Sequence, residues 1–445
     1  MQKKIVLLLL AALTTLGASA QLNGNGYYRL KNKVTGNYAT FASDVFSYDQ
    51  VLQNVGASNM TSDNGKKTAA LKAGLYLQHD IKMVADPTTV PASIFYLKNQ
   101  SSNTYNLLGN GANIYDISTG VYTGSSSLGN VNVDGFYAVI NKVSGGGDIY
   151  TIYVNPKVTV TVTVIFWPVS YTCDMGNQYF KDSYGNFSIE KDASSKDSAQ
   201  WYIEPVTTFN VSCLEKVKKG DYYYTTLCVD FPFTIPESGS TVHAAYKVIG
   251  KNADGFAVLE EITGTIPGGT PVLLECSSYK AEDNVLNIAT STAPAGKSCD
   301  DGAVVSSDGN YLQGRYFNSP GEQPPYYNAV NNNNKENMYI AQNILTNNQT
   351  NYRVLNIVDG QVGFYKLKNA SSRMGANKAF LNIANLPTVS DNNTKAFSME
   401  AGDGTTGITT ATTTHDNVIY DLQGRRVTSI NKGGIYIVNG KKVAY

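Results

Sequence analysis

The residue types that most often carry chemistry at neutral pH are sparse in this sequence. Histidine, the usual proton carrier and metal ligand, occurs three times in 445 residues, at His79, His243 and His415. No two of these have the spacing of a metal-binding pair, and no Gly-x-Ser-x-Gly motif presents a serine nucleophile. His79 stands beside Asp80, a pair more typical of a solvated surface than of a catalytic dyad. The sequence therefore predicts no metal centre and no nucleophilic catalysis.

Two short motifs match cofactor or metal patterns only in part. Gly402–Gly407 has the glycine spacing of a dinucleotide-binding turn, but that turn must lead into a helix, and Ile408–Thr412 are poor helix formers. Asn130–Gly135 resembles the start of a calcium loop, but Asn141 stands where the loop needs a bidentate Glu. We therefore expect no cofactor and no bound metal.

Paired carboxylates are a catalytic chemistry that needs no recognisable motif, because a glycosidase requires only two Asp or Glu side chains across the scissile bond. Asp and Glu together number 35, so such a site could form at many places. The chain lacks the strand-helix alternation of barrel hydrolases, however. We predict a non-enzymatic protein and keep a carboxylate-dependent hydrolase as an alternative.

Tyrosine, with 31 residues, offers a binding chemistry instead. Sugars present apolar C–H faces that stack on aromatic rings, while Asn and Asp side chains hydrogen-bond the sugar hydroxyls. Three tyrosines lie near Asn or Asp in predicted turns: Tyr38, Tyr115 and Tyr184. The alternative is that these rings pack in a core or against a neighbouring strand. We predict glycan binding, with these three tyrosines as candidate contacts.

The elements that position these residues are predicted to be strands. Tyr, Val, Thr and Ile favour pleated, half-buried surfaces, and Asn-Gly, Asp-Gly and Gly-Asn pairs supply turns at short intervals. The clearest strand is Val158–Val164, where Val and Thr alternate and the valines share one face. The sequence therefore predicts an all-β protein. Its formal net charge of zero, without blocks of like charge, argues against nucleic acid or an anionic membrane surface as a partner.

The N-terminus has the three parts of a secretory signal peptide. Lys3 and Lys4 are followed by the apolar run Ile5–Leu13 and by small residues that end at Ala20. We predict that residues 1–20 are removed, leaving Gln21 first. No second long apolar run follows, so we expect no stable membrane span in the mature chain.

Residues 22–206 are predicted to form the first domain. They open with the strand Tyr27–Asn32 and close with the strand Ala199–Pro205, and Ser93–Leu97 echoes the closing strand. This segment resembles the ricin-type β-trefoil family, which implies a β-trefoil-like fold and carbohydrate binding. The family's Gln-x-Trp motif is not intact, because Ala199 stands two residues before Trp201. In the family that motif packs beneath each sugar pocket, so a structural or adhesive protein that binds protein partners is the alternative.

Residues 207–400 are predicted to form a β-sandwich. Strand patterns such as Tyr224–Phe233, His243–Val248 and Pro271–Glu275 alternate with Gly-rich corners. They resemble an uncharacterised β-sandwich module of bacterial surface proteins, a resemblance that implies an architecture but no activity. Residues 401–415 are rich in Thr and Gly and are predicted to be a linker.

Residues 416–445 are predicted to form a short β-hairpin tail. Asn439-Gly440 suits a type I′ turn because both residues tolerate positive φ. The strip resembles the C-terminal sorting domains of the type IX secretion system, which implies contact with secretion machinery and a place at the outer-membrane surface or outside the cell. The residues that carry the resemblance are Asp421, Gly424, Arg425, Gly434, Tyr436, Asn439 and Gly440.

Five cysteines are present, and export would expose them to an oxidising compartment. An odd number leaves at least one thiol unpaired within a single chain. The region from Cys213 to Cys299 holds four of them, and the sequence cannot choose among their three possible pairings or exclude that all stay as buried thiols.

Overall fold

The computed structural model describes a large part of the chain. The described residues are 22, 24–41, 81–110, 112–113, 130–134, 137–155, 157–164, 167–174, 176–296, 304–305, 308–316, 351–366, 374–390, 395–399, 419–421, 426–427, 435–438 and 441–444. Within these ranges the regular elements are strands and three short 3-10 turns, and no α-helix occurs. In the same ranges no helix is long and apolar enough to cross a membrane. The predicted all-β class is confirmed.

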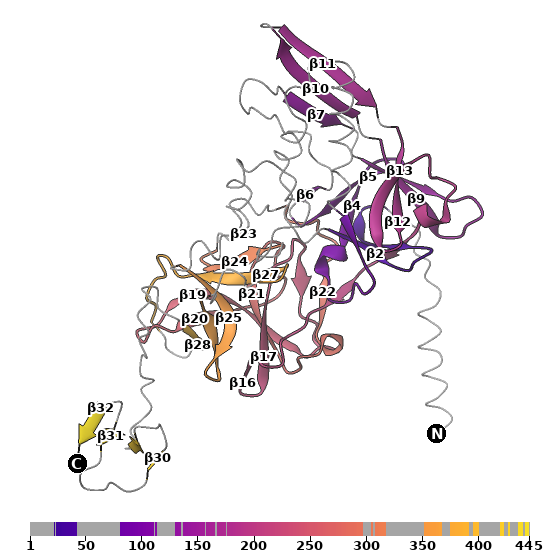
Figure 1. The fold of residues 1–445 in the computed structure, drawn as a ribbon. Helices are drawn as coiled ribbons and strands as arrows, with labels where there is room; N and C mark the ends of the chain where they lie inside the picture. Colours follow the sequence, from indigo (N-terminus) through magenta and orange to yellow (C-terminus); the bar gives the residue numbers. More distant parts are fainter. Residues whose placement is uncertain are drawn as a thin grey trace, which may run out of the picture. The chain divides into compact units, whose positions relative to one another are not determined.

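Six strands of the N-terminal segment close into a barrel (Figure 1). In the order of the ring they are β1 (Gly26–Asn32), β4 (Phe95–Ser101), β5 (Thr104–Gly109), β8 (Ala138–Lys142), β9 (Ile149–Val154) and β14 (Gln200–Pro205). The last strand closes the ring, because β14 pairs antiparallel with β1 at Leu30↔Ile203 and with β9 at Tyr150↔Trp201. The predicted strand Tyr27–Asn32 and the predicted closing strand Ala199–Pro205 are therefore neighbours, although Ala199 itself belongs to the 3-10 turn ahead of β14.

Further strands lie beside the barrel in each third of the segment. The hairpin β2 (Tyr38–Phe41) and β3 (Ile81–Val84) adjoins β1, β6 (Ala112–Asn113) adjoins β5, and the hairpin β12 (Gln178–Ser183) and β13 (Asn186–Lys191) adjoins β9. Two 3-10 turns occupy matching places, η3 (Pro91–Ser93) before β4 and η4 (Asp197–Ala199) before β14. The chain thus repeats one order three times: barrel strand, outlying strand or hairpin, barrel strand.

The barrel interior is filled by large apolar side chains that alternate along the strands, as a half-buried strand requires. Leu30, Phe95, Leu97, Ile152 and Trp201 are fully buried. The indole N–H of Trp201 donates a hydrogen bond of 3.0 Å to the carbonyl oxygen of Phe180 in β12. This bond ties the closing strand to the outlying hairpin, so Trp201 serves the core here.

A separate three-stranded sheet contains the predicted Val-Thr strand. It consists of β7 (Asn130–Asp134), β10 (Lys157–Val164) and β11 (Trp167–Asp174), in the order β11-β10-β7. The register pairs valine positions of β10 with positions such as Tyr171 and Val169, and threonine positions with Thr172 and Ser170. Valine and threonine positions of β10 therefore alternate between the two faces of this sheet. The strand predicted at Val158–Val164 is confirmed.

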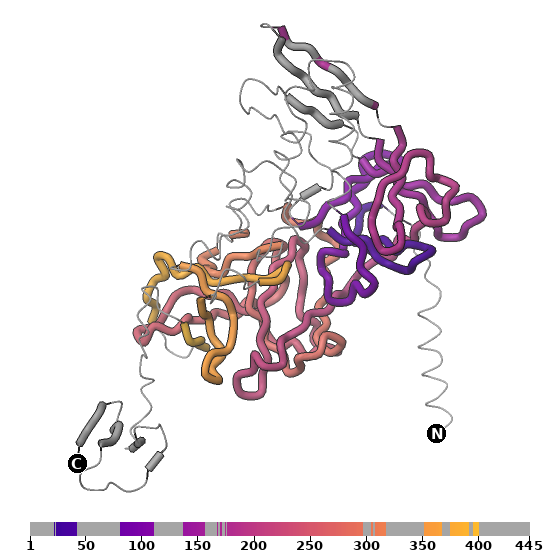
Figure 2. The backbone as a smooth tube through the Cα atoms, viewed as in Figure 1, coloured from indigo at the N-terminus to yellow at the C-terminus, as the bar shows by residue number. Residues whose placement is uncertain are grey.

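The following segment is built on an 11-stranded sheet that curls into a half-barrel. In sheet order its strands are β16 (Lys218–Lys219), β17 (Tyr222–Leu227), β21 (Val272–Cys276), β19 (Val242–Lys251), β20 (Ala257–Ile262), β28 (Ala396–Met399), β26 (Gln361–Tyr365), β25 (Tyr352–Val358), β27 (Lys378–Asn382), β24 (Leu312–Arg315) and β23 (Val304–Val305). All described pairs are antiparallel except β26 and β28. Figure 2 follows this curl along the backbone. The strand predicted over Tyr224–Phe233 is divided, because β17 ends at Leu227 and β18 (Phe233–Thr234) belongs to another sheet.

A small sheet covers part of the large one. It contains β15 (Thr208–Asn210), β22 (Val285–Ile288) and β18 (Phe233–Thr234), and the 3-10 turn η5 (Ala281–Asp283) precedes β22. Alternate residues of β21 serve two cores: Leu274 packs in the cluster that contains Phe209 of the small sheet, and Leu273 packs in the curl of the large sheet. The first cluster also contains Tyr27 and Ile94 of the barrel segment. Residues 1–400 accordingly form one compact unit.

The C-terminal residues 401–445 form a second unit. Four strands in the order β30-β29-β31-β32 make its sheet: β29 (Ile419–Asp421), β30 (Arg426–Val427), β31 (Ile435–Val438) and β32 (Lys441–Ala444). Val438 pairs with Lys441 across the two-residue connection Asn439-Gly440, which itself lies outside the described residues.

Candidate functional site

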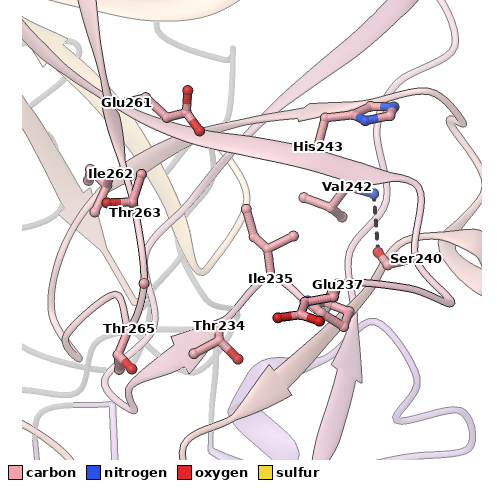
Figure 3. A pocket seen from close by; sticks show the side chains of 12 residues that line it. Thr234, Ile235, Glu237, Ser240, Val242, His243, Glu261, Ile262, Thr263 and Thr265 are labelled. Atoms are coloured by element: carbon pink, nitrogen blue, oxygen red, sulfur yellow. Dashed lines mark hydrogen bonds between the residues drawn. The ribbon is translucent and has the colours of Figure 1, made fainter.

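A surface cavity of about 660 Å³ lies beside the large sheet, between the chain that joins β18 to β19 and the chain that leaves β20 (Figure 3). Pockets of this size hold small organic ligands such as monosaccharides. The cavity is lined by Thr234, Ile235, Pro236, Glu237, Ser240, Val242, His243, Glu261, Ile262, Thr263, Gly264 and Thr265.

Strand pairing and loop hydrogen bonds hold the two walls in place. β19 and β20 pair at Ala245↔Ile262, so the start of β19 and the end of β20 lie side by side. At the base, the backbones of Phe233 and Ile266 exchange two hydrogen bonds of 3.0 and 2.8 Å. The Ser240 hydroxyl oxygen accepts hydrogen bonds of 3.1 Å from the backbone N–H groups of Val242 and Val285, which fixes the loop ahead of β19.

The lining has negative charge and no permanent positive charge. Glu237 and Glu261 lie on opposite sides with Ile235 between them in Figure 3, and neither has an ion-pair partner among the described residues. None of the lining residues is Lys or Arg. The hydroxyl groups of four Ser and Thr residues add donors and acceptors. His243 stands at the rim, where its ring meets that of Tyr222 edge-on with centroids 5.1 Å apart.

This arrangement can bind a ligand that is rich in hydrogen-bond donors. Carboxylates accept strong hydrogen bonds from hydroxyl groups, and Ile235 offers an apolar contact for a C–H face. In the described residues no group of three His, Cys, Asp or Glu side chains is placed to hold a metal ion. Glu237, Glu261 and His243 were not predicted as site residues. No local motif marks them, because the two walls come from segments about twenty residues apart in sequence.

Tyr38, one of the predicted sugar contacts, interacts with two barrel strands. Its hydroxyl group donates a hydrogen bond of 3.1 Å to Glu204 Oε2, and the ammonium group of Lys31 lies 5.4 Å from its ring centroid. Burial, reinforced by the charge of Glu204, raises the pKa of Tyr38. The second predicted contact, Tyr115, lies outside the described residues.

Tyr184, the third predicted contact, is fully exposed at the turn between β12 and β13. Its φ is +53°, an unusual value for a residue with a side chain. The turn is fixed by Asp182, whose carboxylate accepts hydrogen bonds of 2.6 Å from the Gly185 N–H and 3.0 Å from Asn37 Nδ2, as well as one from the Thr35 hydroxyl. The structure therefore brings the predicted residue Tyr184 beside the Thr35–Asn37 turn, and the hydrogen bonds to Asp182 hold the two turns together.

The predicted sorting residues are only partly within the described ranges. Asp421 lies on β29 and Tyr436 on β31, and the two are paired in register. The residues that lie outside the described ranges are Gly424, Arg425, Gly434, Asn439 and Gly440, together with Ala20 and Gln21 at the predicted cleavage site.

A buried ion pair in the large sheet is the other notable polar feature. Glu275 is 5% exposed and accepts hydrogen bonds from the Tyr224 hydroxyl group, at 2.6 Å, and from Lys395 Nζ. The rings of Tyr222, Tyr224 and Tyr246 surround the Lys395 ammonium at 5.1 to 5.6 Å from their centroids. Burial alone would lower the pKa of Lys395, but the hydrogen bond to Glu275 and the neighbouring negative charge raise it overall.

No protein-family model, curated protein or solved structure matches this chain.

Proposed function

We propose that this is an exported, non-enzymatic protein that binds carbohydrate. The observation that carries the proposal is the cavity between β18–β19 and β20, because it combines two unpaired carboxylates, several hydroxyl groups and an apolar patch in a volume of about 660 Å³. Sugar hydroxyls supply the donors that Glu237 and Glu261 lack, and Ile235 lies where a sugar C–H face would pack.

The barrel segment supplies a second candidate contact. Its closed six-strand ring, with outlying strands in each third, supports the interpretation of residues 22–206 as a β-trefoil-like domain. Tyr184 is fully exposed and so contributes nothing to the core, which favours a role in binding. Asn37, held next to its turn by Asp182, would add a hydrogen-bond donor at the same edge.

The remaining segments fit an exported surface protein. The small sheet packed on the large one supports a sandwich-like second module for residues 207–400. Residues 401–445 form their own unit, which suits a tail recognised by secretion machinery after the signal peptide has been removed. A structural or adhesive surface protein that binds a protein partner is the alternative.

The test is a glycan array with the mature chain, followed by titration of each sugar that binds. If the cavity is the site, Glu237→Gln and Glu261→Gln should each weaken binding about tenfold or more, because each removes a charged hydrogen-bond acceptor. Glu260→Gln is the matched control. Glu260 directly precedes Glu261 in β20, forms an ion pair of 3.0 Å with Lys247 and does not line the cavity. Tyr184→Ala tests the barrel contact in the same titration.

Each outcome separates the alternatives. An array without any bound glycan contradicts carbohydrate binding and, with capture of a surface protein, supports the adhesive alternative. Binding that all three glutamate variants retain, but that Tyr184→Ala loses, would place the sugar on the barrel. Turnover of a bound glycan that Glu237→Gln and Glu261→Gln both abolish would support the hydrolase alternative.

A further inference from the structure

Two of the five cysteines meet where the small sheet is fastened to the large one. Cys213 lies three residues after β15, and Cys276 is the last residue of β21. Both are buried in the hydrophobic cluster that the two sheets share. The backbone N–H of Cys213 donates a hydrogen bond of 3.2 Å to the carbonyl oxygen of Tyr279, three residues beyond Cys276. The two segments are therefore held against each other by the backbone as well.

The two thiols influence each other's acidity. Their interaction lowers the pKa of the Cys213 thiol and raises that of Cys276, so Cys213 is the first to become a thiolate. The ammonium group of Lys378 favours that thiolate by its charge, and it is itself fixed by a hydrogen bond of 2.8 Å from Nζ to Thr225 Oγ1.

We propose that Cys213 and Cys276 form a disulfide bond once the chain meets an oxidant of the disulfide class. The Cys213 thiolate attacks one sulfur of a protein or small-molecule disulfide, and that disulfide's other half leaves as a thiol. The Cys276 thiolate then attacks Cys213 Sγ in the mixed disulfide and releases the second thiol. The two cysteine thiols are oxidised, the donor disulfide is reduced to two thiols, and the protons of both cysteines pass to the two leaving groups.

The other cysteines have different surroundings. Cys228 is fully buried in a separate cluster with Val304 and Tyr316. Cys173 is at the β11 position that pairs with Val158 of β10, in the separate three-stranded sheet. Cys299 lies outside the described residues. Of the single bonds that the sequence leaves open in the Cys213–Cys299 region, the structure favours the one between Cys213 and Cys276, which share one buried cluster. This bond would close a loop of about 60 residues and fasten β15 to β21, a loop length at which a disulfide gives strong stabilisation.

In the cell the oxidant is supplied by the proposed export, but the pairing itself can be tested with purified protein. The mature chain is prepared with its thiols reduced, then incubated in its folded state with oxidised glutathione and, separately, refolded in a glutathione redox buffer. Free thiols are blocked by alkylation and the peptides are mapped without reduction. We expect the cross-linked peptide of Cys213 and Cys276 as the major species in both preparations, and a loss of two titratable thiols.

Two variants provide controls. Cys228→Ser should still lose two thiols and keep the same cross-linked peptide, whereas Cys276→Ser should lose none by intramolecular pairing. The thermal midpoint of the oxidised chain should fall on addition of reductant in wild type and Cys228→Ser. Alkylation of both Cys213 and Cys276 after each treatment, or a major cross-link to any other cysteine, would overturn the proposal. Because the mapping needs no sugar, its failure and the failure of carbohydrate binding are separate results.

Discussion

Replacement of Lys395 by methionine should destabilise the large sheet by about 2 kcal/mol. The variant keeps most of the volume of the side chain among its three tyrosines but removes the cation that balances Glu275. The carboxylate of Glu275 would remain buried and would still accept the hydrogen bond of the Tyr224 hydroxyl group. A buried charge without its counter-ion is costly, since the interior solvates it poorly.

The magnitude follows from the exposure of the two partners. Removing one member of a fully buried ion pair costs about 3–5 kcal/mol. The Lys395 side chain is 33% exposed and that of Glu275 is 7% exposed, so water can partly replace the lost ammonium group. The hydrogen bond from Tyr224 also persists. Both effects lower the cost to about 2 kcal/mol, still well above the value for a surface pair.

The assay is denaturant unfolding followed by near-ultraviolet circular dichroism, which reports on the tyrosine rings. Lys247→Met is the matched control, because Lys247 pairs with the exposed Glu260 on the same sheet at 3.0 Å. That variant should change the free energy of unfolding by less than about 1 kcal/mol. In the double variant Lys395→Met/Glu275→Gln, removal of the unpaired charge should restore at least about 1 kcal/mol.

Two results would refute this reasoning. One is a Lys395→Met variant that is as stable as Lys247→Met, which would mean that Glu275 is solvated or protonated in the folded chain. The other is an additive double variant, which would mean that Lys395 and Glu275 do not interact.

Two further predictions concern pH and export. Burial raises the pKa of the Tyr27 and Tyr224 hydroxyl groups in the folded chain. Above pH 10, the ordinary pKa of tyrosine, the unfolded chain loses these protons while the folded chain keeps them. The contribution of the two tyrosines to stability is therefore complete below pH 10 and is lost as the pH rises further. Stability should therefore decline above pH 10 in a pH series of denaturant titrations, and Tyr224→Phe should reduce the slope by about 1.4 kcal/mol per pH unit. Deletion of Tyr420–Tyr445 should leave the protein in the periplasm, as judged by fractionation and surface labelling, and normal surface exposure of the truncated chain would contradict the sorting role.

The strands of the barrel segment could be located from local sequence. Alternating Val and Thr predict β10, and the opening stretch Tyr27–Asn32 and closing stretch Ala199–Pro205 of the trefoil resemblance predict β1 and β14. The echo seen at Ser93–Leu97 has a structural counterpart, because a 3-10 turn precedes β4 just as one precedes β14. These are short-range features, and neighbouring residues decide them.

The closure of the sheets could not be predicted in the same way. Whether β1 pairs with β14 depends on residues about 170 positions apart, such as Leu30 and Ile203, and their pattern is compatible with many partners. The same holds for the parallel pair of β26 and β28, since no local signal distinguishes it from an antiparallel neighbour.

The candidate sites were predictable to different degrees. Tyr184 could be selected because Gly185 and Asn186 indicate a turn and Tyr184 is an aromatic residue directly beside them. The cavity could not, because Glu237 and Glu261 line one cavity only through the pairing of β19 with β20. The shared cluster of Cys213 and Cys276 has the same origin, since it requires the small sheet to pack on the large one.

The position of β28 has a consequence for the order in which the chain can fold. Of the described strands, β28 is the last one before residues 401–445, yet in the sheet it stands between β20 and β26. The two halves of the large sheet are therefore joined only when this four-residue strand is in place, just as the barrel closes only when β14 is in place. Contacts between such distant segments form slowly, because a long loop must close before they add stability. A chain that emerges from its N-terminus therefore cannot complete this sheet until Ala396–Met399 has emerged.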